Sequence, residues 1–210
     1  MTLTGPPLLA ATNLHLWRGD RHVLRGVSLG IRSGEALHVW GPNGAGKTSL
    51  LRVICGLLHA EEGEVTWNAL PIQQEESRYL EYLSYLAHDT ALKGDLTALE
   101  NLQFSVGLRR DVEPAELRAM LEDLEVEHCA DLPCRVLSAG QKRRVALARV
   151  LLSRSAFWVL DEPFTNLDAA SSERVSRALG EHLARGGLAL IAAHQGLDLR
   201  AGTVTRLGLT

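Results

Sequence analysis

The sequence has few cysteines, no long apolar run and no excess of positive charge. Its 210 residues include three cysteines, and this odd count, at no metal-ligand spacing, indicates a reducing compartment. The longest strongly apolar run, Leu188 to Ala193, has six residues. A membrane span needs roughly 20, so we expect none. Lys and Arg number 22 against 25 Asp and Glu, a net charge of −3, which predicts no nucleic-acid partner.

What is present is the composition of an ordinary globular protein, with 46% hydrophobic and 22% charged residues. At roughly 150 residues per domain, residues 1–210 are predicted to form one domain. In the C-terminal half, strands at 157–160 and 188–193 alternate with helices at 139–152 and 169–184. Uninterrupted apolar strands between helices predict a mostly parallel sheet that is covered on both faces.

The N-terminal part and the middle of the chain have other patterns. Leu14 to Trp17 and the alternating residues 27–31 predict β structure, with further strands expected at 36–40, 63–67 and 82–87. The segment from about residue 90 to about residue 135 is predicted to form a small helical subdomain. Thr97 and Glu100 have the spacing of a capping box, and Pro114 stands where a first helical residue fits.

A glycine-rich segment follows the strand at 36–40 and matches the P-loop pattern G-x-x-x-x-G-K-[ST]. Glycines let the backbone wrap a polyphosphate closely, so that its N–H groups and the following helix N-terminus face the negative charge. Lys47 would reach the β- and γ-phosphates, and the Thr48 hydroxyl would bind Mg²⁺. The predicted ATP-binding residues of this loop are Gly41, Pro42, Asn43, Gly44, Ala45, Gly46, Lys47 and Thr48.

The apolar strand at 157–160 ends in two acids, Asp161 and Glu162. At the carboxyl end of a parallel strand beside a P-loop, Asp161 would hold hydrated Mg²⁺. Glu162 would polarise the water that attacks the γ-phosphate. An acidic pair after a strand is more often a solvated turn, and the P-loop upstream is what favours the catalytic interpretation.

A second predicted anion site opens the helix at 139–152, at Ser138, Ala139, Gly140 and Gln141. Ser138 is a good N-cap, and its hydroxyl, the next backbone N–H groups and the helix dipole attract an anion. A plain helix cap is the simpler alternative for such a sequence taken alone. The basic run Lys142-Arg143-Arg144 that follows is interpreted as a solvated face of the helix.

These motifs, in this order, resemble those of the ATP-binding-cassette (ABC) nucleotide-binding domain. Residues 137–141 resemble its signature motif, Asn166-Leu167-Asp168 its D-loop, and His194 its switch histidine. The resemblance implies an α/β P-loop NTPase fold of ABC ATPase type, with an N-terminal antiparallel β part and a helical subdomain. It also implies a head-to-tail pair of copies, in which each ATP lies between the P-loop of one copy and the signature of the other, with Glu162 and His194 in catalysis.

Two positions depart from the family pattern. Trp17 is the candidate for the aromatic residue that stacks on adenine, but Arg18 interrupts the usual aromatic-Gly pair, so packing is an equal alternative. His88, followed by Asp89, stands where the family has a glutamine. Either residue could approach Mg²⁺ through water, and the pair also falls where the family contacts its membrane partner.

A narrower resemblance rests on residues 96–102, 137–149 and 160–165 and on the short length of the chain. Together they are similar to the ATP-binding subunit of the bacterial cytochrome c maturation exporter. This implies ATP hydrolysis with Mg²⁺, two copies bound to integral membrane transporter subunits at the cytoplasmic face of the inner membrane, and a role in haem delivery to c-type cytochromes. The alternatives are another ABC exporter, a soluble ABC ATPase acting on nucleic acid or ribosomes, and a small P-loop kinase.

Overall fold

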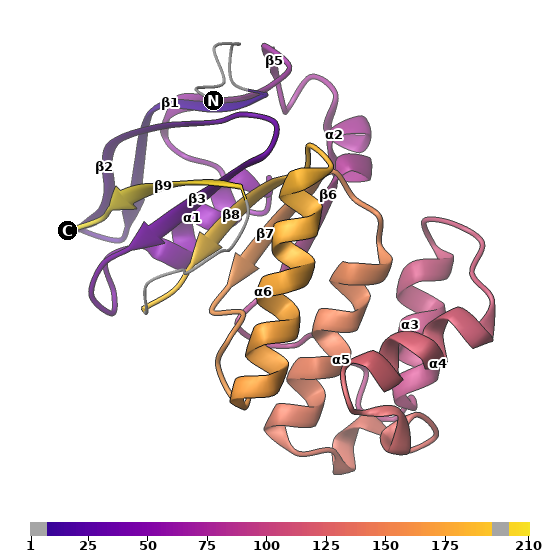
Figure 1. Ribbon diagram of the computed structural model, residues 1–210. Coiled ribbons are helices and arrows are strands. Elements are labelled where there is room, and N and C mark those ends of the chain that lie inside the picture. Colours follow the sequence, from indigo (N-terminus) through magenta and orange to yellow (C-terminus); the bar gives the residue numbers. More distant parts are fainter. Residues whose placement is uncertain (1–7, 195–201) are drawn as a thin grey trace.

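The computed structural model describes residues 8–194 and 202–210, which form two sheets and a set of helices (Figure 1). The strands of the first sheet are antiparallel and lie in the order β2-β1-β4-β5. Their bounds are β1 Leu9–Arg18, β2 Arg21–Ile31, β4 Glu62–Trp67 and β5 Leu70–Pro71. The N-terminal β part expected from the sequence is this sheet.

The second sheet is parallel in every pair and has the order β6-β7-β8-β3-β9. Its strands are β3 Glu35–Trp40, β6 Leu83–Leu86, β7 Phe157–Asp161, β8 Leu188–Ala192 and β9 Thr203–Gly208. Every residue of β7 and β8 is buried. Successive side chains of β7 enter different cores, Phe157 on the side of the antiparallel sheet and Trp158 on the side of the helices. The predicted sheet covered on both faces is confirmed, because strand side chains alternate between two apolar layers.

Helices cover the parallel sheet from both sides and extend beyond it (Figure 1). The helix α1 lies against β7 and β8 on the side of the antiparallel sheet, whereas α5 contacts β6 and α6 contacts β8 on the other. The helices are α1 Lys47–Ile54, α2 Glu76–Tyr82, α3 Ala98–Gly107, α4 Pro114–Asp123, α5 Ala139–Leu152 and α6 Ala169–Ala184, with short 3₁₀ turns at Glu127–Cys129 and Cys134–Val136. Among the described residues, no helix is both long and apolar enough to cross a membrane.

The helical part around α3 and α4 begins as its sequence predicted. The Thr97 hydroxyl accepts a hydrogen bond from the Glu100 N–H, the Glu100 carboxylate accepts one from the Thr97 N–H, and Pro114 is the first residue of α4. Asn101 is buried, and its amide nitrogen donates to the carbonyls of residues 93, 96 and 97. This amide holds the loop before α3 against the helix, because a buried amide is stable only when its polar atoms are paired.

Candidate nucleotide site

The glycine-rich loop joins β3 to α1 and has the backbone that its sequence predicted. A Cβ atom on Gly41 would collide with the carbonyl oxygen of Leu209, and one on Gly46 would lie 2.8 Å from a methyl group of Val23. Both glycines also have positive φ, which side chains disfavour. The Lys47 ammonium donates to the Gly41 and Pro42 carbonyls at 2.8 and 3.2 Å. These bonds hold a buried cation over the loop, where it could meet a phosphate.

Oxygen atoms of the helix start and of β7 meet beside this loop. The Thr48 hydroxyl donates to the Asp161 carboxylate at 2.8 Å, and Asp161 is 1% exposed at the end of its strand. A buried carboxylate whose partner is a neutral hydroxyl favours a nearby cation. The pair is a hard oxygen donor set of the kind that Mg²⁺ prefers, so these residues fit that ion.

The second acid of the pair lies next to the predicted switch histidine. Glu162 Oε1 is 3.3 Å from His194 Nε2, which is ion-pair distance, but the two atoms are not aligned as a hydrogen bond, so this buried oxygen has no hydrogen-bond partner in the described chain. Glu162 has φ +52°, an unfavourable left-handed conformation for a residue with a side chain. Strain and an unpaired acceptor oxygen in one residue are typical of a functional carboxylate rather than of a solvated turn.

These groups line one cavity of about 380 Å³. Its walls come from the P-loop, the start of α1, the ends of β7 and β8, His88 and the hairpin between β1 and β2. Asp89 is not among the described residues that line it. The described lining residues are Arg18, Arg21, Val23, Asn43, Gly44, Gly46, Lys47, Thr48, Ser49, His88, Asp161, Glu162 and His194.

Arg18 and Arg21 are cavity residues that the sequence analysis did not identify. Arg21 donates from Nη2 to the Gly44 carbonyl at 2.7 Å and so connects the β1–β2 hairpin to the P-loop. The only sequence signal was two arginines around a Gly-Asp turn, which does not show that the hairpin lies over the loop. Among the described residues that line the cavity, Arg18, Arg21 and Lys47 are cations, and Asp161 and Glu162 are acids.

Trp17 lies on β1 next to this cavity but is not among its lining residues. Its indole stacks on the His22 imidazole, with ring centroids 3.9 Å apart and planes 6° apart. One face of the indole is thus covered by a ring of the neighbouring strand. This contact supports the alternative that Trp17 packs within the protein. The stacking of Trp17 on adenine stays a prediction.

The residues of the proposed second anion site lie at the start of α5. Ser138 caps this helix and forms a full capping box with Gln141, and a Cβ on Gly140 would lie 2.9 Å from the Asn166 carbonyl. None of Ser138, Ala139, Gly140 and Gln141 is among the described lining residues of the cavity. Asp168 caps α6 and pairs with Arg144 at 2.6 Å. The lowered pKa of the Asp168 carboxyl has its main cause in the hydrogen bonds from Ser171, to which Arg144 adds.

The expectation of a solvated basic face at 142–144 is wrong for Arg143. Its side chain is buried, 3% exposed, and its guanidinium donates to backbone carbonyls at the ends of β6 and β7. Successive helical residues point about 100° apart, so three consecutive cations cannot share one face. Arg143 takes the inner face.

The chain resembles known proteins over most of its length. Residues 24–165 match the family described as ABC transporter. The cytochrome c biogenesis ATP-binding export protein CcmA of Aromatoleum aromaticum is 46% identical over 191 residues, which cover 90% of this chain and 89% of that protein. The protein of the same name from Escherichia coli K12 is 38% identical over 203 residues, or 97% of each chain. A dimeric post-hydrolysis state of the ATP-binding cassette MJ0796, bound to ADP and Pi, superposes with a TM-score of 0.82 at 26% identity over 96% of each chain.

The chain belongs to the ABC transporter family. It is an ABC-type ATPase, and the fold and the family that its motifs predicted are confirmed. Cassettes of this family form dimers, as in the MJ0796 structure.

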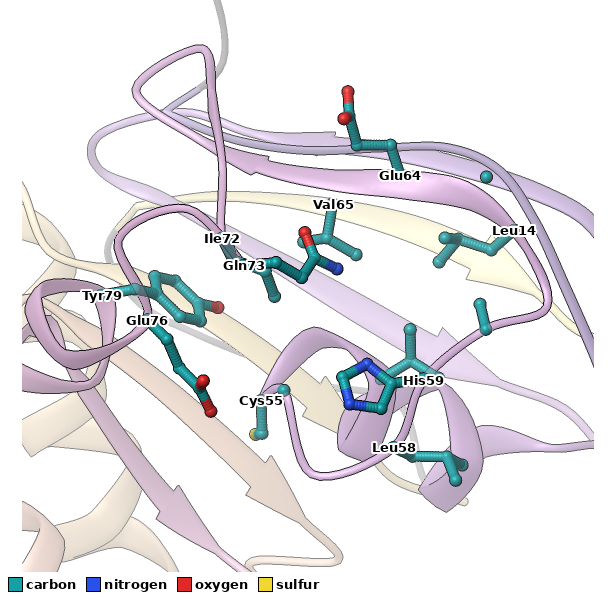
Figure 2. A pocket seen from close by; sticks show the side chains of 14 residues that line it. Leu14, Cys55, Leu58, His59, Glu64, Val65, Ile72, Gln73, Glu76 and Tyr79 are labelled. Atoms are coloured by element: carbon teal, nitrogen blue, oxygen red, sulfur yellow. The ribbon is translucent and has the colours of Figure 1, made fainter.

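The ABC ATPase has another, smaller cavity of about 50 Å³ between β4, the C-terminal end of α1 and α2 (Figure 2). His59, Gln73 and Glu76 line it together with Cys55 and Tyr79. Burial raises the pKa of the Cys55 thiol far above its usual range, and the Tyr79 hydroxyl donates to the Ile54 carbonyl at 2.7 Å. A neutral thiol is a poor nucleophile and metal ligand. The described lining of this cavity shares no residue with that of the nucleotide cavity.

Proposed function

We propose that the cavity between the P-loop and β7 is the ATP hydrolysis site and that Glu162 is its general base. The observation that carries this proposal is the strained Glu162, whose buried Oε1 has no hydrogen-bond partner in the described chain and which lines the same cavity as Lys47 and Thr48. An acceptor oxygen without a donor is available to take the proton of an attacking water. His194 Nε2, 3.3 Å from Glu162 Oε1, would orient this carboxylate by donating to it when substrate is bound.

The P-loop binds the phosphates. Its backbone N–H groups and the α1 N-terminus face the negative charge, and Lys47 exchanges its bonds to the Gly41 and Pro42 carbonyls for bonds to the β- and γ-phosphates. The Thr48 hydroxyl and the Asp161 carboxylate would hold Mg²⁺, which when bound neutralises phosphate charge. Of the two residues predicted to contact the ion through water, His88 lines the same cavity, and Asp89 is not among its described lining residues.

We further propose that two copies pair head-to-tail. The support is that the described lining of the cavity includes no residue from 138 to 141, although Ser138 and the start of α5 form an anion site by their chemistry. Such a site needs a phosphate from elsewhere, and the nucleotide of a second copy supplies it. Asp168, which caps α6 and pairs with Arg144, lies on the element next to this surface.

The names of the similar proteins support a role of this ATPase in transport. Because proteins 38–46% identical over nearly the whole chain are named for ATP-binding export in cytochrome c biogenesis, we propose that this ATPase drives haem delivery for c-type cytochromes. It would bind integral membrane transporter subunits at the cytoplasmic face of the inner membrane. The helical part supports such docking, since Phe104 and Leu108 of the α3 segment are 48% and 74% exposed.

The test is Lys47→Ala in the bacterium that carries the gene. We expect covalent haem attachment to c-type cytochromes to be lost, while b-type haemoproteins stay normal, because only covalent attachment depends on this complex. Haem staining of c-type cytochromes measures the outcome, with the level of the variant protein checked by immunoblot. Normal staining at a normal protein level would leave the chain as the ATPase of another ABC exporter.

A further inference from the structure

Arg143 is a buried cation whose partners are main-chain carbonyls of two other segments. Its Nη1 donates to the Ala87 carbonyl at 2.8 Å and to the His88 carbonyl at 3.4 Å. Its Nη2 donates to the Asp161 and Glu162 carbonyls at 2.5 and 2.7 Å. One planar guanidinium thus fixes the loop after β6 and the end of β7 to the helix α5.

Stability alone is a poor explanation for this arrangement. Moving a charge out of water is costly, and a well-packed apolar side chain of similar volume is often at least as stabilising as a buried ion. Burial lowers the pKa of Arg143, while the nearby charges of Asp161 and Glu162 oppose that shift, and arginine keeps its proton in proteins. The Arg143 Nε atom is buried without a hydrogen-bond partner in the described chain. One donor of the guanidinium is therefore unsatisfied, which further lowers the contribution of this side chain to stability. What the side chain supplies is a rigid fork with defined directions.

The segment that the fork holds contains the strained residue. In an extended strand, successive residues point in opposite directions, but at Glu162 the chain turns into a left-handed conformation with φ +52°. The carbonyls of Asp161 and Glu162 therefore both lie within reach of one nitrogen of Arg143. On the other side, the Glu162 N–H donates to the Ala192 carbonyl of β8 at 2.8 Å. A left-handed conformation at a residue with a side chain persists only when its surroundings hold it. Arg143 contributes two of the hydrogen bonds that do so, those to the Asp161 and Glu162 carbonyls.

We propose that Arg143 is a positioning residue that holds Glu162 in its left-handed conformation, with the carboxylate toward the nucleotide cavity and His194. Arg143 acts through the main chain and touches no substrate. It also fixes the His88 loop to the same guanidinium, so the two sides of the cavity keep one relative position. This inference rests on the proposed role of Glu162 as the general base.

The test uses Arg143→Met, which fills the volume without donors, and Arg143→Lys, which keeps the charge. A misplacement of about 1 Å lowers rates on the order of 100-fold. We therefore expect kcat of Arg143→Met to fall by roughly 10- to 100-fold, with KM for ATP within about threefold because the P-loop contacts are intact. Arg143→Lys should recover part of the loss, since an ammonium can still donate to some of the carbonyls.

A double-mutant cycle separates positioning from general damage. If Arg143 acts through Glu162, then Arg143→Met should lower kcat by less than about twofold in a Glu162→Gln background, because the group that it positions is already inactive. Losses that multiply in the double variant would overturn the proposal, as would a folded Arg143→Met with the parent kcat. A parent rate for Glu162→Gln alone would instead disprove the proposed general base.

The matched control is Arg110→Met. Arg110 also donates to a backbone carbonyl, that of Leu152, and pairs with Glu116, but it does not line the nucleotide cavity. We expect this variant to lower Tm and to keep kcat. If Arg143→Met does not fold, Arg143→Lys enters the same cycle with Glu162→Gln, and a multiplicative loss there refutes positioning in the same way.

Discussion

Replacing Glu162 by Gln removes the proposed base and almost nothing else. The amide has the shape of the carboxylate, and the main-chain bonds that hold residue 162 come from Arg143 and reach the Ala192 carbonyl. The side chain accepts no hydrogen bond at Oε1, so the substitution breaks none there. The fold and the P-loop contacts of Lys47 should therefore survive.

The size of the effect follows from the role. General bases contribute about 10²- to 10⁴-fold to a rate, so we expect kcat to fall at least about 100-fold, which corresponds to roughly 2.7 kcal/mol of barrier. The affinity for ATP should stay within about threefold, because Lys47 and Thr48 are unchanged and lie on a different segment. Bound ATP that is not hydrolysed keeps the contacts between the two copies, so the variant should accumulate as an ATP-bound dimer.

The assay is phosphate release at saturating ATP and Mg²⁺, together with gel filtration in the presence of ATP or ADP. Glu122→Gln is the control, because Glu122 is an exposed acid of α4 away from the cavity and its loss should leave kcat at the parent value. Hydrolysis by Glu162→Gln at the parent rate would refute the assignment. A slow variant that stays monomeric with ATP would refute the dimer step alone.

Two other predictions concern the walls of the site. Lys47→Ala and Ser138→Arg chains, each inactive alone, should regain activity when mixed, since one composite site of a mixed dimer carries neither change. With random pairing and independent sites the recovery is about a quarter of the parent rate in a phosphate-release assay, and no recovery at any mixing ratio would contradict independent sites in trans. Arg21→Ala should raise KM for ATP by roughly three- to tenfold with kcat within about twofold, because it removes a cavity cation and its bond to the Gly44 carbonyl. Arg25→Ala on the same strand is the control in the same steady-state assay, and an unchanged KM for Arg21→Ala would remove this residue from the site.

The parts of the fold that the sequence predicted are those that local patterns determine. The apolar runs that became β7 and β8 are short and uninterrupted, which favours buried strands, and Thr97 and Ser138 cap their helices by contacts within four residues. The apolar pattern after the P-loop predicts a helix from Lys47 to Leu58, but the helix ends at Ile54, where Gly56 with φ +73° stops it. The short helix α2 and the edge strand β9 were not predicted, because neither has a long periodic pattern.

The site was predictable as far as its motifs are contiguous. Lys47, Thr48, Asp161 and Glu162 were predicted to act together because each belongs to a short pattern with its own chemistry, and the parallel sheet places all four around one cavity. Arg21 was missed because its role depends on the hairpin between β1 and β2 lying over the P-loop. The hairpin belongs to the antiparallel sheet and the P-loop follows a strand of the parallel sheet, so their contact is a tertiary one. No spacing of residues along the chain predicts it.

Arg143 shows how a charge run can mislead even inside a well-predicted helix. A run of three cations invites the interpretation of a solvated face, yet at 100° per residue the three side chains point in three directions. Arg143 lies three and four residues before Ala146 and Leu147, both buried, which places it on the apolar face of α5. Helical periodicity therefore predicts that Arg143 is buried, whereas the charge of the run alone predicts that it is exposed. A cation on such a face needs acceptors within the protein, and the carbonyls of the acidic strand end are the acceptors that the sheet supplies there.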